Sequence, residues 1–356
     1  MSSTRLTRVT PDHNNTAAAS ALAPADPSTA PAPGSPASLA VRPARSVVSR
    51  ASRRAGDPLA KIGKAGGWVT DRDRRVLALL IEHRVATADQ IARVEFPCPN
   101  RARVRLEQLA TRHFLARWRP YVRPGSAPYH YTVGPVGAAL DAAANERPAP
   151  KPSEVARDAW RLEHSPNLAH RLGVVEFFTR LHGHARTFPG AALVEWWSEE
   201  TTAPECMGVL RPDGYGRWTE PTRDGQCEVQ FLYEHDRGTE PLDTLLAKLD
   251  KYRILAERHQ VNLPVLIELP THVREANLHR AIARRRPADG PFVFVATTST
   301  EYLAAAGHNP AGPIWRPAGA SAATGSTRYR LATLPTRGDL VTALPGNHGA
   351  DLVGRA

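Results

Sequence analysis

The stretch of residues 228–240, which reads EVQFLYEHDRGTE, decides how the second half of this chain folds. Its side chains alternate as in a β-strand, with one apolar and aromatic face and one face that carries two acids: Val229, Phe231 and Tyr233 opposite Leu232, Glu234 and Asp236. Like charges two residues apart on one face repel each other, which predicts a cationic group beside them. The sequence Arg237-Gly238-Thr239 ends the strand, and Pro241 favours the start of a helix.

Helical and extended patterns alternate on both sides of this strand. The expected order is a helix over residues 168–181, a strand at 192–197, a short strand at 209–214 that ends in a turn, the strand quoted above, a helix at 242–259, a strand at 263–269, a helix at 274–284 and a strand at 292–297. This order predicts a mixed α/β domain.

Acidic residues on two neighbouring strands are expected to converge. Pro212-Asp213 lies at the end of the short strand, and Glu234 and Asp236 lie on the next one. Oxygen donors suit Mg²⁺, so the candidate metal ligands are Asp213, Glu234 and Asp236. Lys248 and Tyr252 lie one turn apart on the following helix, at the margin of its inward face. Two alternatives stay open, namely metal binding without cleavage, and a turn aspartate beside acids that pair with arginines.

The first half of the chain contains three helical patterns and a hairpin pattern. Thr70 with Asp73, and Thr87 with Gln90, have the spacing of capping boxes at helix starts. A third helix is expected over residues 100–113, followed by strands at 115–122 and 129–133 around the turn Pro124-Gly125-Ser126. Three helices followed by a basic hairpin is the order of a winged helix-turn-helix domain.

The third helix separates a buried side from a basic side. The candidate DNA contacts are Arg101, Arg105, Gln108 and Arg112 on that helix and Arg117, Arg119 and Arg123 on the hairpin. Arginine and amide side chains on a helix suit base edges, and arginines on the wing suit phosphates. The alternatives are a solvated basic face, and a module that docks another protein or a second copy of the chain.

Composition limits the classes of partner. The 356 residues carry a formal net charge of +11, which favours a polyanion, and nucleic acid is the expected one. No apolar run approaches the roughly 20 residues of a spanning helix, so no membrane partner is expected. Cys98, Cys206 and Cys227 are far apart, which argues against a disulfide framework or a zinc site and fits a reducing cytoplasm.

The acidic pattern resembles the restriction-endonuclease-like core, whose signature is PD followed by (D/E)xK. Pro212-Asp213 and Glu234 match the signature, but Asp236 stands at the lysine position. In that fold the lysine is sometimes supplied by the following helix, which makes Lys248 its counterpart. Lys248 and Tyr252 are also similar to the QxxxY motif of RecB-like nucleases, with Lys in place of Gln. The resemblance implies a Mg²⁺-dependent nuclease or nickase whose candidate catalytic residues are Asp213, Glu234, Asp236, Lys248 and Tyr252.

Over residues 67–316 the chain resembles the replication-relaxation family of proteins from plasmids and integrative elements. The most specific part is Glu234-His235-Asp236-Arg237-Gly238-Thr239-Glu240 with Lys248 and Tyr252. The resemblance implies double-stranded DNA binding in replication, relaxation or transfer, alongside other plasmid replication or transfer proteins. A transcription regulator with an inert second domain is a further alternative.

The expected architecture has five parts. They are a disordered basic tail at residues 1–66, a winged helix-turn-helix domain at 67–140, a linker at 141–156, a restriction-endonuclease-like α/β domain at 157–317 and a loose tail at 318–356.

Overall fold

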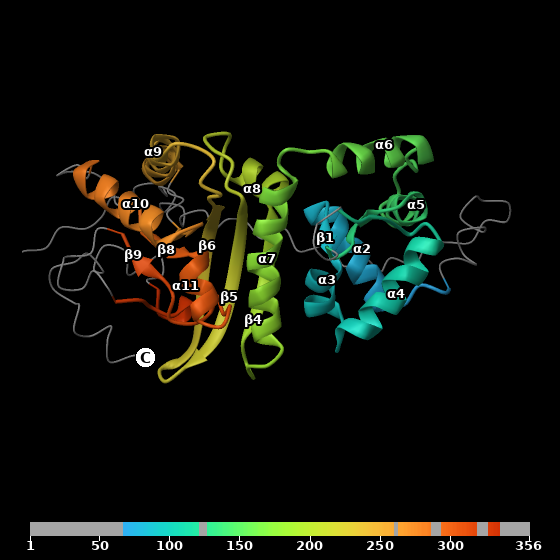
Figure 1. Ribbon diagram of the computed structural model, residues 1–356, viewed down its shortest axis with the longest axis horizontal. Coiled ribbons are helices and arrows are strands. Elements are labelled where there is room, and N and C mark those ends of the chain that lie inside the picture. Colours follow the sequence, from blue (N-terminus) through green and yellow to red (C-terminus); the bar gives the residue numbers. More distant parts are fainter. Residues whose placement is uncertain (1–66, 121–126, 260–262, 286–292, 319–326, 335–356) are drawn as a thin grey trace, which may run out of the picture. The chain divides into compact units, whose positions relative to one another are not determined.

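The computed structural model describes residues 67–120, 127–259, 263–285, 293–318 and 327–334 (Figure 1). These residues form a mixed α/β structure of helices and two sheets. The predicted disordered tail at residues 1–66 lies outside the described residues, as do Arg123 and the turn Pro124-Gly125-Ser126. None of the described helices combines the length and the apolar character that crossing a membrane requires.

The elements of the first part are α2 (Asp71–His83), β1 (Ala86–Thr87), α3 (Ala88–Glu95), α4 (Pro99–Thr111), β2 (Leu115–Trp118), β3 (His130–Val133), α5 (Pro135–Ala144) and α6 (Pro152–Glu163). Those of the second part are α7 (Leu168–Ala185), β4 (Ala192–Ser198), α8 (Glu199–Glu205), β5 (Gly214–Thr222), β6 (Gly225–His235), α9 (Leu242–His259), β7 (Val265–Leu269), α10 (His272–Arg285), β8 (Val295–Ser299), α11 (Thr300–Ala305), β9 (Arg316–Pro317) and the 3₁₀ helix η1 (Leu331–Thr333).

Side-chain caps fix the starts of α2 and α3, and both predicted capping boxes are confirmed. The Thr70 hydroxyl accepts from the backbone N–H of Asp73, and the Asp73 carboxylate accepts from the backbone N–H of Thr70. Thr87 and Gln90 make the same reciprocal pair at α3. Each box satisfies two backbone donors that a helix start leaves unpaired.

The first part packs around one apolar core. Its antiparallel sheet has the order β1-β3-β2, with Tyr131 of β3 opposite Ala86 and Arg117. The inner sides of α2, α3 and α4 close over this sheet and bury Leu80, Ile91 and Leu106. The face of α4 away from this core is exposed.

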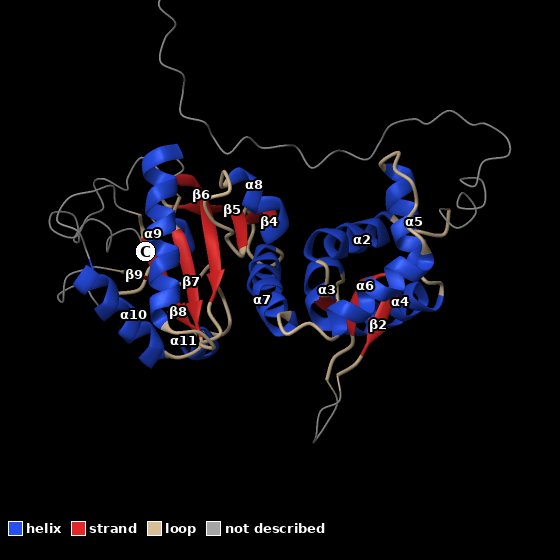
Figure 2. Ribbon diagram, turned by 90° about the horizontal axis from the view of Figure 1, so that it is seen from above, coloured by secondary structure: helices blue, strands red, loops and turns tan. Residues whose placement is uncertain are grey.

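Six strands form one mixed sheet in the second part, with the order β4-β5-β6-β7-β8-β9 among the described residues. Neighbours β4, β5 and β6 pair antiparallel, β6, β7 and β8 pair parallel, and β9 returns antiparallel to β8. Helix α7 packs on one face, and α9 and α10 pack on the other, as both views show (Figures 1 and 2).

The alternation seen in the sequence of β6 explains this layering. Val229, Phe231 and Tyr233 lie in the apolar cluster that contains Phe177 and Phe178 of α7. On the opposite face, Leu232 joins a second cluster with residues of α9, β7 and α10. Because successive side chains of a strand point to opposite faces, one strand supplies both cores.

Two predicted segments, a linker and a short strand, differ from the structure. The segment predicted as a linker, 141–156, contains the end of α5 and the start of α6, so the stretch between these helices is residues 145–151. Helix α6 has no fully buried residue, although Val155, Ala159 and Leu162, which are spaced along one face of the helix, are partly buried. The short strand predicted at 209–214 is wrong, because β5 begins at Gly214 and Asp213 precedes it.

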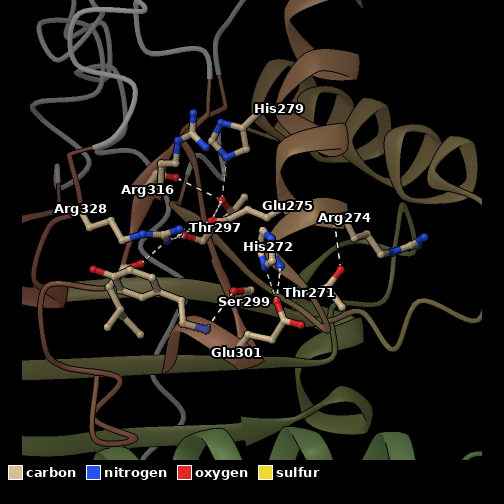
Figure 3. Close-up of polar contacts among 12 residues, drawn as sticks. Thr271, His272, Arg274, Glu275, His279, Thr297, Ser299, Glu301, Arg316 and Arg328 are labelled. Carbon is tan, nitrogen blue, oxygen red and sulfur yellow. Dashed lines mark hydrogen bonds and ion pairs between the residues drawn. The ribbon is translucent and has the colours of Figure 1, made fainter. Parts of the chain in front are cut away.

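Residues 327–334, which fall within the predicted loose tail, are packed. Leu331 and Leu334 are buried in the same cluster as Trp315, and Tyr329 forms a β-bridge with Trp315. Arg328 enters a polar network around Glu275 of α10, which Figure 3 shows together with Thr297 and His279. These contacts join segments that lie 53 residues apart in the chain, which explains why the composition of the tail gave no sign of them.

His83 at the end of α2 stacks on Trp196 of β4, with ring centroids 3.7 Å apart. Burial lowers the pKa of His83 to about 3, although attraction to Glu82 opposes the shift. The folded state therefore holds this imidazole neutral where the unfolded chain protonates it. The stability that follows is complete above about pH 6.5 and declines as the pH falls towards 3.

We therefore expect His83→Phe, which keeps a stacking ring but cannot titrate, to flatten the acid side of the stability profile. Between pH 7 and pH 4.5 the wild type should lose about 2 kcal/mol more unfolding free energy than the variant. Urea unfolding at several pH values measures this difference. Parallel profiles for the two proteins would contradict the neutral, buried state of His83.

Candidate functional site

The register of the β5–β6 hairpin brings Asp213 and Glu234 together. Gly214 pairs with Tyr233, so the next residues outward are Asp213 and Glu234. The backbone N–H of Asp213 donates to the carbonyl of Tyr233 at 3.1 Å, and the backbone N–H of His235 donates to the Asp213 carboxylate at 2.8 Å. The main chain thus holds the Asp213 side chain at the end of β6.

Helix α9 supplies two groups to the same place. The Lys248 ammonium donates a short hydrogen bond to one Glu234 oxygen and lies 3.5 Å from Oδ1 of Asp213. One turn further along, the Tyr252 hydroxyl donates to the other Glu234 oxygen. The Glu234 side chain is 4% exposed, whereas that of Lys248 is 27% exposed. Lys248 therefore bridges two acids at the boundary between the core and solvent.

Asp236 does not join this cluster. Its carboxylate accepts two hydrogen bonds from Arg274 of α10, at 2.5 and 3.2 Å, and it also accepts from the backbone N–H of Gly238. Within the described ranges no group of three acidic, histidine or cysteine side chains is arranged to hold a metal ion. The structure thus brings two of the three predicted carboxylates together and places the third, Asp236, against Arg274.

Helix α7 adds a histidine that the sequence analysis did not select. His170 Nε2 lies 3.3 Å from Oδ2 of Asp213, and its ring is 5.7 Å from that of His235. Gly173 allows the approach of α7, since a Cβ there would lie 2.1 Å from Nε2 of His235. A histidine on a helix start gives no local signal of a contact with a residue 43 positions later.

These groups line an open pocket of about 330 Å³. Its wall includes His170, Asp213, Glu234, Asp236, Arg237, Lys248 and Arg274. Arg274 is engaged with Asp236, whereas Arg237 is exposed at the rim and makes no ion pair with any residue that the structure describes. The pocket thus combines a buried acid pair with cationic groups that a phosphate could reach.

The charges of the pocket are set by burial and by its own members. Burial alone raises the pKa of Asp213, but the hydrogen bond from His170 and attraction to Lys248 prevail, and the net pKa lies well below its usual range. Burial, with the nearby Asp213 charge, raises the pKa of Glu234 above its usual value, while the hydrogen bonds that its two oxygens accept from Lys248 and Tyr252 favour the carboxylate. Burial disfavours the Lys248 ammonium, yet the two acids raise its pKa above the usual value. Lys248 therefore stays charged at neutral pH.

The DNA contacts predicted on α4 differ in their surroundings. Arg101 is exposed and makes no ion pair with any residue in the described ranges, and the same holds for Arg103. Arg105 is used inside the fold, because it bonds both carboxylate oxygens of Asp73, at 3.0 and 2.5 Å, and lies over the Trp68 ring. Sequence spacing could not reveal this partner, which lies 32 residues earlier.

The remaining predicted contacts lie at the surface. Gln108 is exposed and accepts from Arg105 at 3.1 Å, and Arg112 is exposed with its guanidinium 4.1 Å from the centre of the Trp68 ring. On β2, Arg117 pairs with Glu107 at 3.2 Å, and Arg119, just beyond the strand, lies over the Tyr129 ring. The α4 face therefore offers Arg101 and Arg103 as cations that form no ion pair with the part of the chain that the structure describes.

A sequence profile of the replication-relaxation family matches residues 77–266, which is more than half of the chain. The chain belongs to the replication-relaxation family. The matched residues include α4, Asp213, Glu234, Lys248 and Tyr252. No curated protein and no solved structure matches the chain. What this replication-relaxation protein does at its pocket must therefore be argued from its own residues.

A divalent ion fits the acid pair of this replication-relaxation protein. Proteins usually hold Mg²⁺ through one or two carboxylates, while water and substrate phosphates complete the octahedron. Asp213 and Glu234 would be those ligands, and an ion there would lower the pKa of a bound water and stabilise charge on a phosphate. The ammonium of Lys248 contacts both ligands, so it stands where such an ion would have to enter.

Glu176 of α7 is a further carboxylate that could bind a metal ion, but its hydrogen bonds lie outside the pocket. Its carboxylate accepts from Gln90 at 3.0 Å, from Arg93 at 3.2 Å and from Arg180 at 2.8 Å. These bonds link α3 to α7, and Glu176 is absent from the wall of the pocket. The acid therefore has a structural role in the replication-relaxation protein.

Proposed function

We propose that this chain binds double-stranded DNA and acts in the replication, relaxation or transfer of a plasmid or integrative element. The membership in the replication-relaxation family supports the process. The net charge of +11 supports the polyanionic partner, because a basic surface attracts the phosphate backbone irrespective of sequence.

The observation that carries this proposal is the exposed basic face of α4. The helix follows α2, β1 and α3 and precedes the β2–β3 pair, which is the order of a winged helix-turn-helix domain. In such a domain this helix enters the major groove and the hairpin lies along the backbone. We assign this role to residues 67–140, and a second domain to residues 157–317.

The surroundings of each arginine revise the set of expected contacts. Arg101 and Arg103 are the best candidates for phosphates or guanine edges, since neither forms an ion pair or a cation–π contact with a described residue. Val104, which follows Arg103, is 55% exposed, and an apolar side chain there suits a thymine methyl group. Arg105 instead positions α4 through Asp73.

The test is the affinity of the full chain for a duplex. Replacing both Arg101 and Arg103 by alanine should weaken binding by at least about 30-fold at fixed salt, since each good arginine contact contributes about 1–3 kcal/mol and two are lost. Fluorescence anisotropy with a labelled 30-base-pair duplex measures this. Arg223→Ala, in the turn between β5 and β6, is the matched control and should bind as the wild type does. Equal affinity of the double variant and the control would reject α4 as the interface.

The acid pocket supports a second candidate function, a Mg²⁺-dependent DNA nuclease or nickase in a restriction-endonuclease-like domain. The specific observation is the convergence of Asp213, just before β5, with Glu234 of β6 and Lys248 of α9. Two carboxylates and a lysine are the groups that this chemistry requires, and Tyr252 holds Glu234 in place. Mg²⁺-dependent nicking of supercoiled plasmid, lost in Asp213→Asn, would establish it.

A further inference from the structure

Lys248 makes contacts that a metal ion would make. Its ammonium donates to Glu234 and lies 3.5 Å from Asp213, so it places one positive charge between two carboxylates. The Glu234 side chain is almost fully buried, and Asp213 is 10% exposed. Two acids held this close in a buried place need a cation, because their mutual repulsion is weakly screened there.

The other groups of the pocket do not meet this need. Tyr252 gives Glu234 a hydrogen bond but no charge, and Arg274 is paired with Asp236. His170 of α7 contacts Asp213, and its described contacts do not include Glu234. Lys248 is therefore the cation, within the described part of the chain, that contacts both acids.

We propose that Lys248 is a tethered competitor of divalent cations, so that the acid pair holds either the ammonium or a metal ion. The inference rests on the second candidate function only in taking Asp213 and Glu234 as a cation site. Both occupants use the same carboxylate oxygens, and an ion at contact distance from an ammonium would be strongly repelled. A four-carbon stem with rotatable bonds lets the ammonium leave towards the open pocket when a metal ion enters.

The competition between Lys248 and a metal ion makes metal binding depend on a phosphodiester. A lone divalent ion has to displace a charged group that two acids hold, so the site of the resting protein has low affinity for the metal. A phosphate at the rim, near the exposed Arg237, offers the displaced ammonium a new anionic partner. Metal entry is thereby tied to the arrival of a phosphodiester, which keeps the pocket closed to metal without DNA.

The test is Mn²⁺ binding by the full chain in the absence of DNA. Electron paramagnetic resonance monitors this binding, because the signal of free Mn²⁺ is lost when the ion binds. Lys248→Met removes the charge and keeps the length of the stem, and it should bind Mn²⁺ at least about tenfold more tightly than the wild type. Lys251→Met, an exposed lysine on the same helix, should match the wild type. Adding Asp213→Asn to Lys248→Met should abolish the gain.

The melting temperature provides a second measurement in case Lys248→Met folds poorly. Without its ammonium the acid pair repels itself, so Lys248→Met should melt at a lower temperature in EDTA, and Mn²⁺ should restore the melting temperature. Lys248→Gln should behave in the same way. Unchanged Mn²⁺ affinity in both variants, with no thermal rescue, would overturn the proposal. Because this titration contains no DNA and no plasmid, its failure is separate from a failure of DNA binding or of nicking.

Discussion

Replacing Arg328 by alanine is expected to lower the free energy of unfolding by about 3–5 kcal/mol, as removal of one partner from a buried ion pair does. Arg328 pairs with Glu275 at 2.7 Å, and the two side chains are 12% and 2% exposed. It also donates to the carbonyl of Ile314 at 2.8 Å. The variant leaves the Glu275 carboxylate buried with the Thr297 hydroxyl as its remaining described donor (Figure 3).

Urea unfolding of the variant and of two companions measures this cost. Arg285→Ala breaks a solvent-exposed pair with Asp243 and should cost at most about 1 kcal/mol. The double variant Glu275→Gln with Arg328→Met removes both charges and should cost less than Arg328→Ala alone. If Arg328→Ala costs no more than Arg285→Ala, residues 327–334 are not an integral part of the fold.

The second large effect is expected in the pocket. With Mg²⁺, Asp213→Asn or Glu234→Gln should reduce plasmid nicking by at least about 100-fold, because loss of residues one shell further from a metal already costs 10- to 100-fold. Asp236→Asn should lose far less, since its carboxylate is paired with Arg274 and lies outside the acid pair. The measurement is the rate at which supercoiled plasmid becomes open circular, with EDTA as the blank.

The three variants together separate the two descriptions of the site. An equal loss of nicking rate in all three variants would indicate that all three carboxylates take part, as expected from the sequence. Nicking that is equal in the wild type and in Asp213→Asn would come from a contaminant. A wild type that nicks with neither Mg²⁺ nor Mn²⁺ would leave the second part as a DNA-holding surface, or as the inert domain of a transcription regulator.

Local pattern predicted those features whose cause is local. The alternation in β6 placed Glu234 opposite Phe231 and Tyr233, and the four-residue spacing of Lys248 and Tyr252 placed both on one side of α9. The capping boxes at Thr70 and Thr87 marked two helix starts for the same reason. Each of these depends on residues within about one turn or one strand.

Features with distant causes were missed or misassigned. Asp236 pairs with Arg274, which lies 38 residues later in the chain, and Arg105 pairs with Asp73, which lies 32 residues earlier. His170 reaches Asp213 because α7 packs against the sheet close to His235, at Gly173. Charge and spacing along the chain cannot predict which distant residues form an ion pair, because the fold decides which opposite charge lies nearest.

The central claim is that α4 holds DNA through Arg101 and Arg103, and the salt dependence of duplex binding tests it most directly. A plot of log K against log salt concentration has a slope of about −0.9 for each phosphate neutralised. The double alanine variant should show a slope smaller in magnitude by about 2, and Arg223→Ala should show the wild-type slope. A double variant whose slope equals that of the wild type would contradict the account.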